Sequence, residues 1–276
     1  VSVRASCGLC IALSVKVHDL TTSGRVNIID STLRDGEQAP GVIFCRQDKL
    51  RLAKMLAEAG VDELEAGTSA MGVQEQRVIK DILTLVLPCR ISVWCRARRE
   101  DIDAALGLGV PCVHVGFPVS DIVLGTMSKD RLWVLEQLED LIPYALRSCD
   151  FVSVGAMDAF RADSVFLKTF ARRAACVGAF RLRLADTVGN AAPPAVMRMI
   201  AGLADVVGDM ALEFHGHNDL GMATANAVCA AIAGARSLSL TVGGLGERAG
   251  NAALEEVVMA LPLSAGRTCA VDPRRL

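Results

Sequence analysis

The stretch "VNIIDSTLRDGEQAPGVIFCRQDKLRLAKMLAEAGVDELEAG", residues 26–67, contains one complete structural unit and sets the expectation for the whole chain. It begins with the β-branched run "VNIIDST", passes through a polar loop, changes to the helical pattern "RQDKLRLAKMLAEAG", and ends in a second short run, "ELEAG". In the helical part Leu50, Ala53 and Ala57 share one face, and Gly60 supplies a C-terminal stop. This order predicts a βα unit that feeds a parallel sheet.

The same alternation recurs along the chain. After the runs at 26–32 and 63–67 come "ISVWCRA" (91–97), "CVHVGFP" (112–118), "FVSVGAM" (151–157), "RLRLADT" (181–187), "ALEFHGH" (211–217) and "LSLTVGG" (238–244). Eight βα units in about 240 residues match a (β/α)8 TIM barrel, which usually has roughly 250, whereas an open doubly wound sheet commonly has fewer strands. We therefore predict one TIM-barrel catalytic domain over residues 26–276, preceded by a poorly ordered N-terminal extension over residues 1–25.

The helix before the fifth run illustrates a boundary prediction. Leu135, Leu138 and Ile142 form one apolar stripe, and Ser128 stands where an N-cap is expected. Pro143 is expected to kink or end this helix, because proline lacks the backbone N–H that the next turn requires.

The bulk composition favours small-molecule chemistry. The chain has 276 residues, 52% of them hydrophobic, so it can bury a large core. The 29 basic and 31 acidic residues are spread along the chain. They form no concentrated basic stretch of the kind that binds nucleic acid or an anionic membrane. The chain has ten cysteines, most of them in apolar stretches. Cys7 and Cys10 form a C-x-x-C pair, but no second pair stands at the spacing of a zinc site. We therefore expect reduced thiols, a cytoplasmic location and no membrane span.

The first polar cluster is "EFHGHND", residues 213–219, at the end of the seventh run. Side chains alternate along a strand, so Glu213, His215 and His217 point the same way. Two such imidazoles can bind one divalent ion, and Asp35 and Asn251 are candidates to complete the protein ligands. This mixed donor set suits Mg²⁺, Mn²⁺ or Zn²⁺ with positions left for substrate. The alternative is that the histidines only satisfy backbone groups at a strand end.

The second polar cluster is "DSTLRDGEQAPG", residues 30–41, at the end of the first run. It can be an ordinary acidic loop, because Asp and Gly are common in turns. However, Arg34 beside Asp35 places a fixed positive charge next to a metal ligand, where it can hold a 2-oxo acid and stabilise negative charge on its carbonyl oxygen. Gln38 can add a hydrogen bond to the carboxylate of that acid.

Three long stretches carry a family resemblance. "DSTLRDGEQAPGV", "EFHGHNDLGMATANA" and "GGLGERAGNAALEEV" resemble motifs of the metal-dependent acyltransferases that include isopropylmalate, citramalate and homocitrate synthases, with hydroxymethylglutaryl-CoA lyase as a cousin. The shorter stretches "EAGTSAMG", "VWCRA", "FPVSD" and "MSKDRLWVLEQL" are most similar to the homocitrate synthases of nitrogen fixation. The resemblance extends from about residue 26 to the C-terminus.

The resemblance implies specific roles. Asp35, His215, His217 and the more distant Asn251 would hold the metal, and Arg34, Gln38 and Thr187 would contact the 2-oxo acid, which is 2-oxoglutarate in a homocitrate synthase. The implied reaction is a Claisen condensation with acetyl-CoA, in which a base removes a methyl proton and thioester hydrolysis makes the step irreversible. We count Arg34 and Glu213 as candidate catalytic residues, and Glu213 would either support the metal shell or position substrate.

The chain also departs from its relatives. In "GAMDAFRAD", residues 155–163, Met157 replaces an acidic residue and Phe160 a small polar one. Relatives continue past the barrel into a C-terminal region that supplies a lid, dimer contacts and a base, so we expect a homodimer or a second chain to supply that region. The alternatives are a synthase for 2-oxoisovalerate or pyruvate, a lyase, and a non-turnover subunit or decayed paralogue that needs a second chain.

Overall fold

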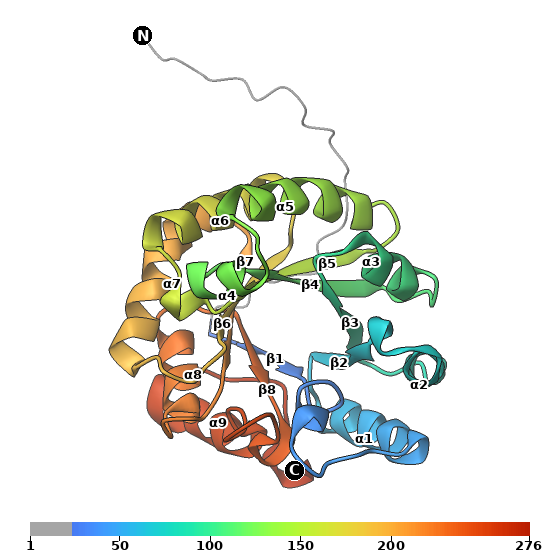
Figure 1. The fold of residues 1–276 in the computed structure, drawn as a ribbon. Helices are drawn as coiled ribbons and strands as arrows, with labels where there is room; N and C mark the ends of the chain where they lie inside the picture. The colour runs from blue at the N-terminus through green and yellow to red at the C-terminus, as the bar shows by residue number, and fades with distance from the viewer. Residues whose placement is uncertain (1–23) are drawn as a thin grey trace.

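The structure, a computed structural model, describes residues 24–276 and forms one closed barrel of eight parallel strands (Figure 1). Each strand pairs with its neighbours in the chain, and β1 pairs with β8 to close the ring. The predicted TIM barrel is therefore confirmed, and every predicted run overlaps one strand. The strands are β1 Asn27–Asp30, β2 Glu63–Thr68, β3 Arg90–Arg96, β4 Cys112–Pro118, β5 Phe151–Met157, β6 Arg181–Asp186, β7 Ala211–Gly216 and β8 Ser237–Leu240.

The helices form an outer ring around the strands, as Figure 1 shows. A short extra helix, α4, precedes α5 in the connection from β4 to β5. The helices are α1 Arg46–Ala59, α2 Val73–Leu83, α3 Arg99–Leu106, α4 Asp121–Thr126, α5 Arg131–Ala145, α6 Ser164–Cys176, α7 Pro193–Val207, α8 Ala223–Ile232 and α9 Leu254–Ala260. Short helical turns cover Gly36–Gln38, Ser69–Met71, Ala159–Arg161, Val242–Gly244, Leu261–Ala265 and Pro273–Arg275.

The end of α1 agrees with the sequence pattern. Gly60 follows the helix with φ 101°, in the left-handed region that favours glycine. A Cβ at this position would lie 2.5 Å from the backbone oxygen of Ala270, so a side chain would also collide with the C-terminal segment. Gly60 thus ends the helix and permits close packing at the same point.

The predicted start of α5 is wrong by a few residues. The helix begins at Arg131, and Asp130 is its N-cap, with a carboxylate oxygen that accepts the backbone N–H of Trp133 at 2.8 Å. Ser128 lies in the turn after α4, with φ 53°. A carboxylate two residues later provides the cap instead. Pro143 lies inside the helix, which ends at Ala145, only two residues further on.

The strands divide apolar and charged side chains between their two faces. On β6, Leu182 and Leu184 are fully buried in the hydrophobic core, whereas Arg181 and Arg183 form ion pairs with glutamates of other strands. Because neighbouring residues face opposite sides of a strand, these arginines point into the barrel and the leucines towards the helices. The barrel is therefore filled partly by charged groups, where branched aliphatic side chains are usual.

The ends of the described chain meet at the base of β1. The backbone N–H of Val26 bonds to the oxygen of Thr268 at 2.8 Å, and Arg25 pairs with Asp62. The predicted extension, residues 1–25, lies outside the described residues except for residues 24 and 25, and Cys7 and Cys10 lie outside them as well. The eight cysteines within residues 24–276 are free thiols.

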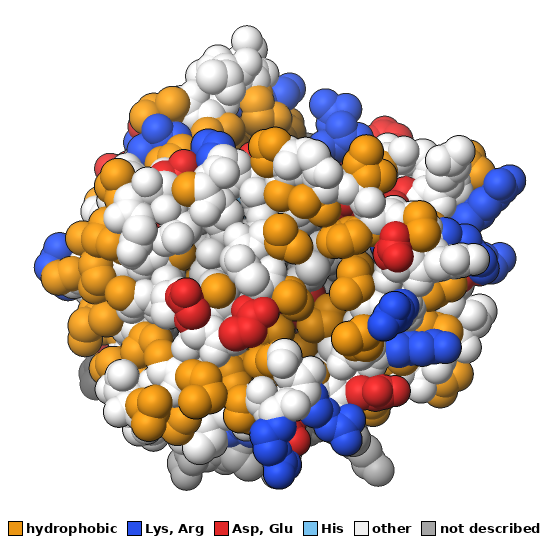
Figure 2. Space-filling model, turned by 90° about the horizontal axis from the view of Figure 1, so that it is seen from below, with side chains coloured by type: hydrophobic (Ala, Val, Ile, Leu, Met, Phe, Trp, Pro, Cys, Tyr) orange, Lys and Arg blue, Asp and Glu red, His pale blue; other side chains and the backbone are white. Residues whose placement is uncertain are grey.

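The surface carries mixed charge. Figure 2 shows one face of the molecule, on which basic and acidic side chains lie scattered among hydrophobic ones. This distribution fits the formal net charge of −2. No helix of the described part is long and apolar enough to cross a membrane.

A core substitution tests the packing of α6 on the barrel. Phe170 is fully buried, and its ring lies 5.7 Å from that of Phe117 on β4. We expect Phe170→Ala to lower the free energy of unfolding by about 3–5 kcal/mol, because it leaves a cavity. Urea denaturation followed by circular dichroism measures this change. Val165→Ala, on the same helix and 70% exposed, should shift stability by less than about 0.5 kcal/mol, and equal losses in both variants would contradict the packing described.

Candidate functional site

One carbonyl group folds the loop after β1 into a tight turn. The backbone oxygen of Ser31 accepts N–H bonds from Arg34 at 3.1 Å, Asp35 at 2.8 Å and Gly36 at 3.1 Å. The loop therefore turns back over the end of the strand instead of leading away from it. As a result, Asp35 lies buried at the carboxyl end of the barrel, at 2% exposure.

Three buried side chains meet at this point. The Nε2 atoms of His215 and His217 lie 3.2 Å and 3.9 Å from Oδ2 of Asp35. One ligand atom from each of the three residues lies within 4.8 Å of the others. The ring of His215 is fixed from behind by Nδ1, which is 3.1 Å from the hydroxyl of Ser239 on β8. The cluster thus presents one carboxylate and two imidazole nitrogens to a common centre.

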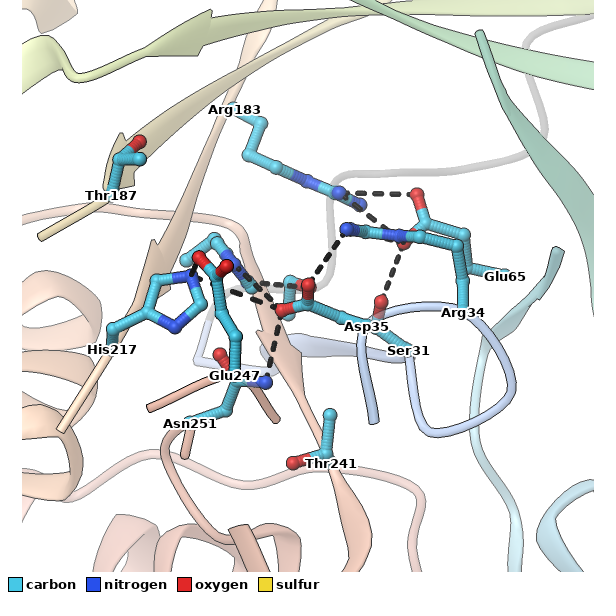
Figure 3. Close-up of polar contacts among 12 residues, drawn as sticks. Ser31, Arg34, Asp35, Glu65, Arg183, Thr187, His217, Thr241, Glu247 and Asn251 are labelled. Carbon is cyan, nitrogen blue, oxygen red and sulfur yellow. Dashed lines mark hydrogen bonds and ion pairs between the residues drawn. The ribbon is translucent and has the colours of Figure 1, made fainter. Parts of the chain in front are cut away.

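Asn251 joins the cluster from the loop after β8. A backbone bridge pairs it with His217, and its side-chain amide donates to Oδ2 of Asp35 at 2.9 Å and to the oxygen of Leu245 at 2.9 Å (Figure 3). Its own Oδ1 is buried without a hydrogen-bond partner, as is Nδ1 of His217. Buried polar atoms are normally paired, so Oδ1 of Asn251, whose amide nitrogen contacts Asp35, is an acceptor that a further group can complete.

The cluster fits a divalent metal ion. Ligands about 2.1 Å from a six-coordinate ion lie roughly 3 Å apart when adjacent and about 4.2 Å apart when opposite, which agrees with the separations among Asp35, His215 and His217. The mixture of carboxylate oxygen and imidazole nitrogen suits Mn²⁺, Zn²⁺ or Mg²⁺. The three residues therefore form a buried triad consistent with a divalent metal site.

The protonation states agree with metal binding. Burial, together with the neighbouring His215, lowers the pKa of His217 to about 3, so its imidazole is neutral at physiological pH. Burial alone would raise the pKa of Asp35, but Arg34 and the hydrogen bond to His215 outweigh it and hold that pKa well below its usual range. Asp35 and His217 are thus in the form that metal ligands require.

Arg34 lies at the edge of the triad in a fixed orientation. Its guanidinium contacts Oδ1 of Asp35 at 2.9 Å and Oε2 of Glu65 at 2.7 Å, and Ser31 donates to the same Glu65 oxygen at 2.5 Å (Figure 3). Burial would raise the pKa of Glu65, but Arg183 and Arg34 lower it further than burial raises it. Glu65 therefore remains a carboxylate and holds Arg34 in place.

A buried ion-pair network continues from Glu65 into the barrel. Arg183 contacts Oε1 of Glu65 at 3.1 Å and Oε1 of Glu213 at 2.5 Å, and Nε of Arg181 lies 2.6 Å from the other oxygen of Glu213. Arg181 also contacts Glu63 at 2.8 Å. Our sequence analysis did not identify these arginines as site residues, although their alternate spacing in "RLRLAD" indicates that both face the interior.

The remaining predicted residues lie at different depths. Glu213 is in the interior network, one layer below His215, and its contacts are with Arg181 and Arg183. Gln38 is exposed in the turn Gly36–Gln38. The hydroxyl of Thr187 accepts the backbone N–H of Asp158 at 2.8 Å. The structure thus brings together Arg34, Asp35, His215, His217 and Asn251, and leaves Glu213, Gln38 and Thr187 outside their direct contacts.

The loop after β8 contributes a carboxylate that our sequence analysis did not single out. Oε1 of Glu247 lies 3.8 Å from Nε2 of His217 and 2.6 Å from Arg248, and it is partly exposed. Arg248 also binds Asp219 at 2.8 Å and the backbone oxygen of Thr187 at 2.7 Å. One side chain thus ties the loops after β6, β7 and β8 together beside the triad.

The fold and this site define a class of protein, the parallel (β/α)8 barrels with a buried Asp–His–His triad consistent with a divalent metal site at the carboxyl ends of the strands. The chain belongs to the HMGL-like family, whose sequence model matches residues 25–274. The fold is similar to that of the hydroxymethylglutaryl-CoA lyase from Pseudomonas aeruginosa, with a TM-score of 0.80 and 24% identity over 91% of this chain and 89% of that one. At this identity the similarity supports the fold alone.

Two relatives are closer in sequence. The chain is 47% identical over 237 residues to 2-isopropylmalate synthase 2 of Caldanaerobacter subterraneus subsp. tengcongensis, which covers 86% of this chain and 62% of that protein. It is 43% identical over 227 residues to the homocitrate synthase subunit alpha of Clostridium pasteurianum, which covers 82% of this chain and 84% of that subunit. This chain therefore spans less than two thirds of the first relative. The two names differ in product, so family membership leaves the acceptor open.

Phe160, one of the two noted departures, has a structural explanation. Its ring packs edge-on against Phe214 with centroids 6.0 Å apart, and it lies against the hydrophobic core. Phe214 alternates with His215 on β7, so it faces the helices rather than the barrel interior. The substitution at position 160 therefore extends the outer core and does not reach the triad.

The first site prediction concerns the metal. We expect His217→Ala to abolish Mn²⁺ binding, because it removes one of three convergent ligands. Titration calorimetry with MnCl₂ measures this loss. His114→Gln is the matched control, since His114 is buried in the barrel against Ser153 and outside the triad. Unchanged Mn²⁺ affinity in His217→Ala would refute the assignment.

The second site prediction concerns Glu213. Its side chain is fully buried and contacts both Arg181 and Arg183. We expect Glu213→Gln to lower the free energy of unfolding by about 3–5 kcal/mol, because it leaves two buried guanidiniums without their shared counter-charge. Urea denaturation measures this loss. Glu136→Gln is the control, because Glu136 lies exposed on α5 and forms no ion pair within residues 24–276. A stable variant that had lost only substrate affinity would instead favour a substrate-positioning role.

Proposed function

We propose that this chain binds a divalent metal ion and a 2-oxo acid, and that it contributes this acceptor site to a condensation with acetyl-CoA. The observation that carries the proposal is Arg34, a guanidinium fixed at the edge of the metal triad by Asp35 and Glu65. A 2-oxo acid has a carboxylate beside a ketone, so a cation beside a metal ion matches both groups. Membership of the HMGL-like family supports the same chemistry.

Arg34 retains donors for a substrate. A guanidinium has five N–H groups, and three nitrogens of Arg34 are engaged by single carboxylate oxygens: Nε and Nη2 by Glu65 and Nη1 by Asp35. Each terminal nitrogen therefore keeps one N–H group. The side chain is 10% exposed, so the guanidinium is largely enclosed beside the triad. Arg34 is thus oriented in advance to receive a carboxylate.

The proposed reaction joins the methyl carbon of acetyl-CoA to the ketone carbon of the acid. A base takes one methyl proton, the ketone oxygen becomes a hydroxyl, and water then cleaves the thioester to release CoA and a second carboxylate. Asp35, His215, His217 and Asn251 would hold the ion, which when bound supplies Lewis-acid polarisation of the ketone. Arg34 would hold the carboxylate and stabilise negative charge on the oxygen. Gln38 and Thr187 remain predicted substrate contacts.

Two further proposals concern the identity of the 2-oxo acid and the arrangement of subunits. The stretches similar to nitrogen-fixation homocitrate synthases favour 2-oxoglutarate, and the Clostridium pasteurianum relative supports it, whereas the isopropylmalate synthase relative supports 2-oxoisovalerate. The word "alpha" in the name of the Clostridium pasteurianum subunit supports a second polypeptide, and a homodimer is the other arrangement that we propose. A chain that needs such a partner would bind metal and acid without turnover.

The test is calorimetric titration of 2-oxoglutarate and 2-oxoisovalerate into the purified chain, with and without Mn²⁺. We expect at least one acid to bind only in the presence of the metal. Arg34→Lys should weaken that binding by at least about tenfold, because lysine keeps the charge but loses the planar fork. The Mn²⁺ affinity of the same variant should be unchanged, which separates loss of the acid site from loss of the metal site.

Release of CoA from acetyl-CoA, followed by a thiol reagent, then distinguishes an enzyme from a non-turnover subunit. Metal-dependent binding of the acid without release of CoA would favour the alternative in which this chain is a subunit that needs a second polypeptide for turnover. Binding of both acids that does not depend on Mn²⁺, or no binding of either, would refute the proposed function.

A further inference from the structure

An apolar wall lies across the ends of β3, β4 and β5. An added Cβ at Gly116 would lie 2.9 Å from Cζ2 of Trp94 and 3.3 Å from Sδ of Met157, so the two side chains converge over this glycine. The residues occupy adjacent strands, because β3 pairs with β4 and Pro118 at the end of β4 pairs with Met157. We call Trp94, Gly116 and Met157 the apolar wall.

The apolar wall adjoins the proposed carboxylate-binding group. The Cζ atom of Arg34 lies 5.8 Å from the centroid of the Trp94 ring. The wall also borders a cavity of about 700 Å³, which continues over Pro118 and Trp133. A 2-oxo acid held through its carboxylate by Arg34 therefore has Trp94 beside it, and the adjoining cavity is large enough for its side chain.

The cations that line this cavity are either paired or solvent-exposed. Arg96 makes a two-pronged contact with Asp101 at 2.8 Å and 2.9 Å, and Arg99 contacts Asp140 at 2.7 Å. Within residues 24–276, Arg98 and Lys129 form no ion pair, and both lie exposed at the rim. None of these cations is part of the apolar wall, so a negative charge placed against the wall has no buried partner there.

We propose that the acceptor is a 2-oxo acid with an uncharged aliphatic side chain, selected by Trp94 and Met157. This inference rests on the proposed function and departs from the 2-oxoglutarate that the sequence resemblance favours. A distal carboxylate would lose water against the wall without gaining a partner, whereas an aliphatic group gains from burial there.

The test compares 2-oxopentanoate with 2-oxoglutarate, which have the same number of carbons and differ in a terminal methyl against a terminal carboxylate. Calorimetric titration of the Mn²⁺-loaded full chain should show at least about tenfold tighter binding of 2-oxopentanoate. Equal or tighter binding of 2-oxoglutarate would overturn this inference and leave the proposed function intact. No metal-dependent binding of either acid would overturn both.

A pair of lysine variants locates the selectivity. Met157→Lys places a cation in the apolar wall and should shift the affinity ratio towards 2-oxoglutarate by at least about tenfold. Met127→Lys places a cation in the same cavity but at the partly exposed end of α4, and should leave the ratio within about twofold of the parent. Equal shifts in both variants, or none in Met157→Lys, would contradict the role of Met157. The comparison in the parent chain does not depend on the folding of either variant.

Discussion

The position of Arg34 depends on a charge buried beneath it. Arg183 bridges Glu65 of β2 and Glu213 of β7 across the interior of the barrel. Glu65 in turn fixes Arg34, and Arg34 contacts Asp35 of the triad. An unpaired charge in this interior would cost free energy. Each residue in the series from Arg183 through Glu65 to Arg34 therefore restricts the orientation of the residue that it pairs with. Buried contacts in the barrel interior thus determine the orientation of the side chains at the mouth of the barrel.

The charge balance of this network bears on the proposed binding of a metal ion and an anion at its upper end. Four guanidiniums face four carboxylates, so the network is close to neutral; they are Arg34, Arg90, Arg181 and Arg183 against Asp35, Glu63, Glu65 and Glu213. A divalent ion held by Asp35 and two histidines therefore adds uncompensated positive charge. The carboxylate of a bound acid offsets part of it, and so binding of ion and acid should favour one another.

The sequence predicted the architecture because the architecture depends on local patterns. The hydrophobic periodicity of strands and helices, and the glycine that ends α1, are signals that span only a few residues. The resulting order of strands and helices places Asp35 and His215 at the same end of a barrel. The pairing of Arg183 with Glu65 joins residues 118 positions apart, and only the register of the closed sheet decides it. For the same reason Glu213 was recognised as facing inward but not as lying one layer below the metal. Gln38 stays a prediction, and its exposure in the turn that buries Asp35 could not be read from the sequence either.

The mouth of the barrel is divided into two halves with different chemistry. The triad, Asn251 and Arg34 follow β7, β8 and β1, and Glu65 on β2 holds Arg34 in place (Figure 3). The ends of β3, β4 and β5 carry Trp94, Gly116 and Met157, which are held by packing alone. A substitution in the first half disturbs a chain of paired charges, whereas one in the second changes only the shape and polarity of a surface. The proposed selection of the acceptor therefore depends on the second half, whose shape and polarity can change without disturbing the paired charges of the first.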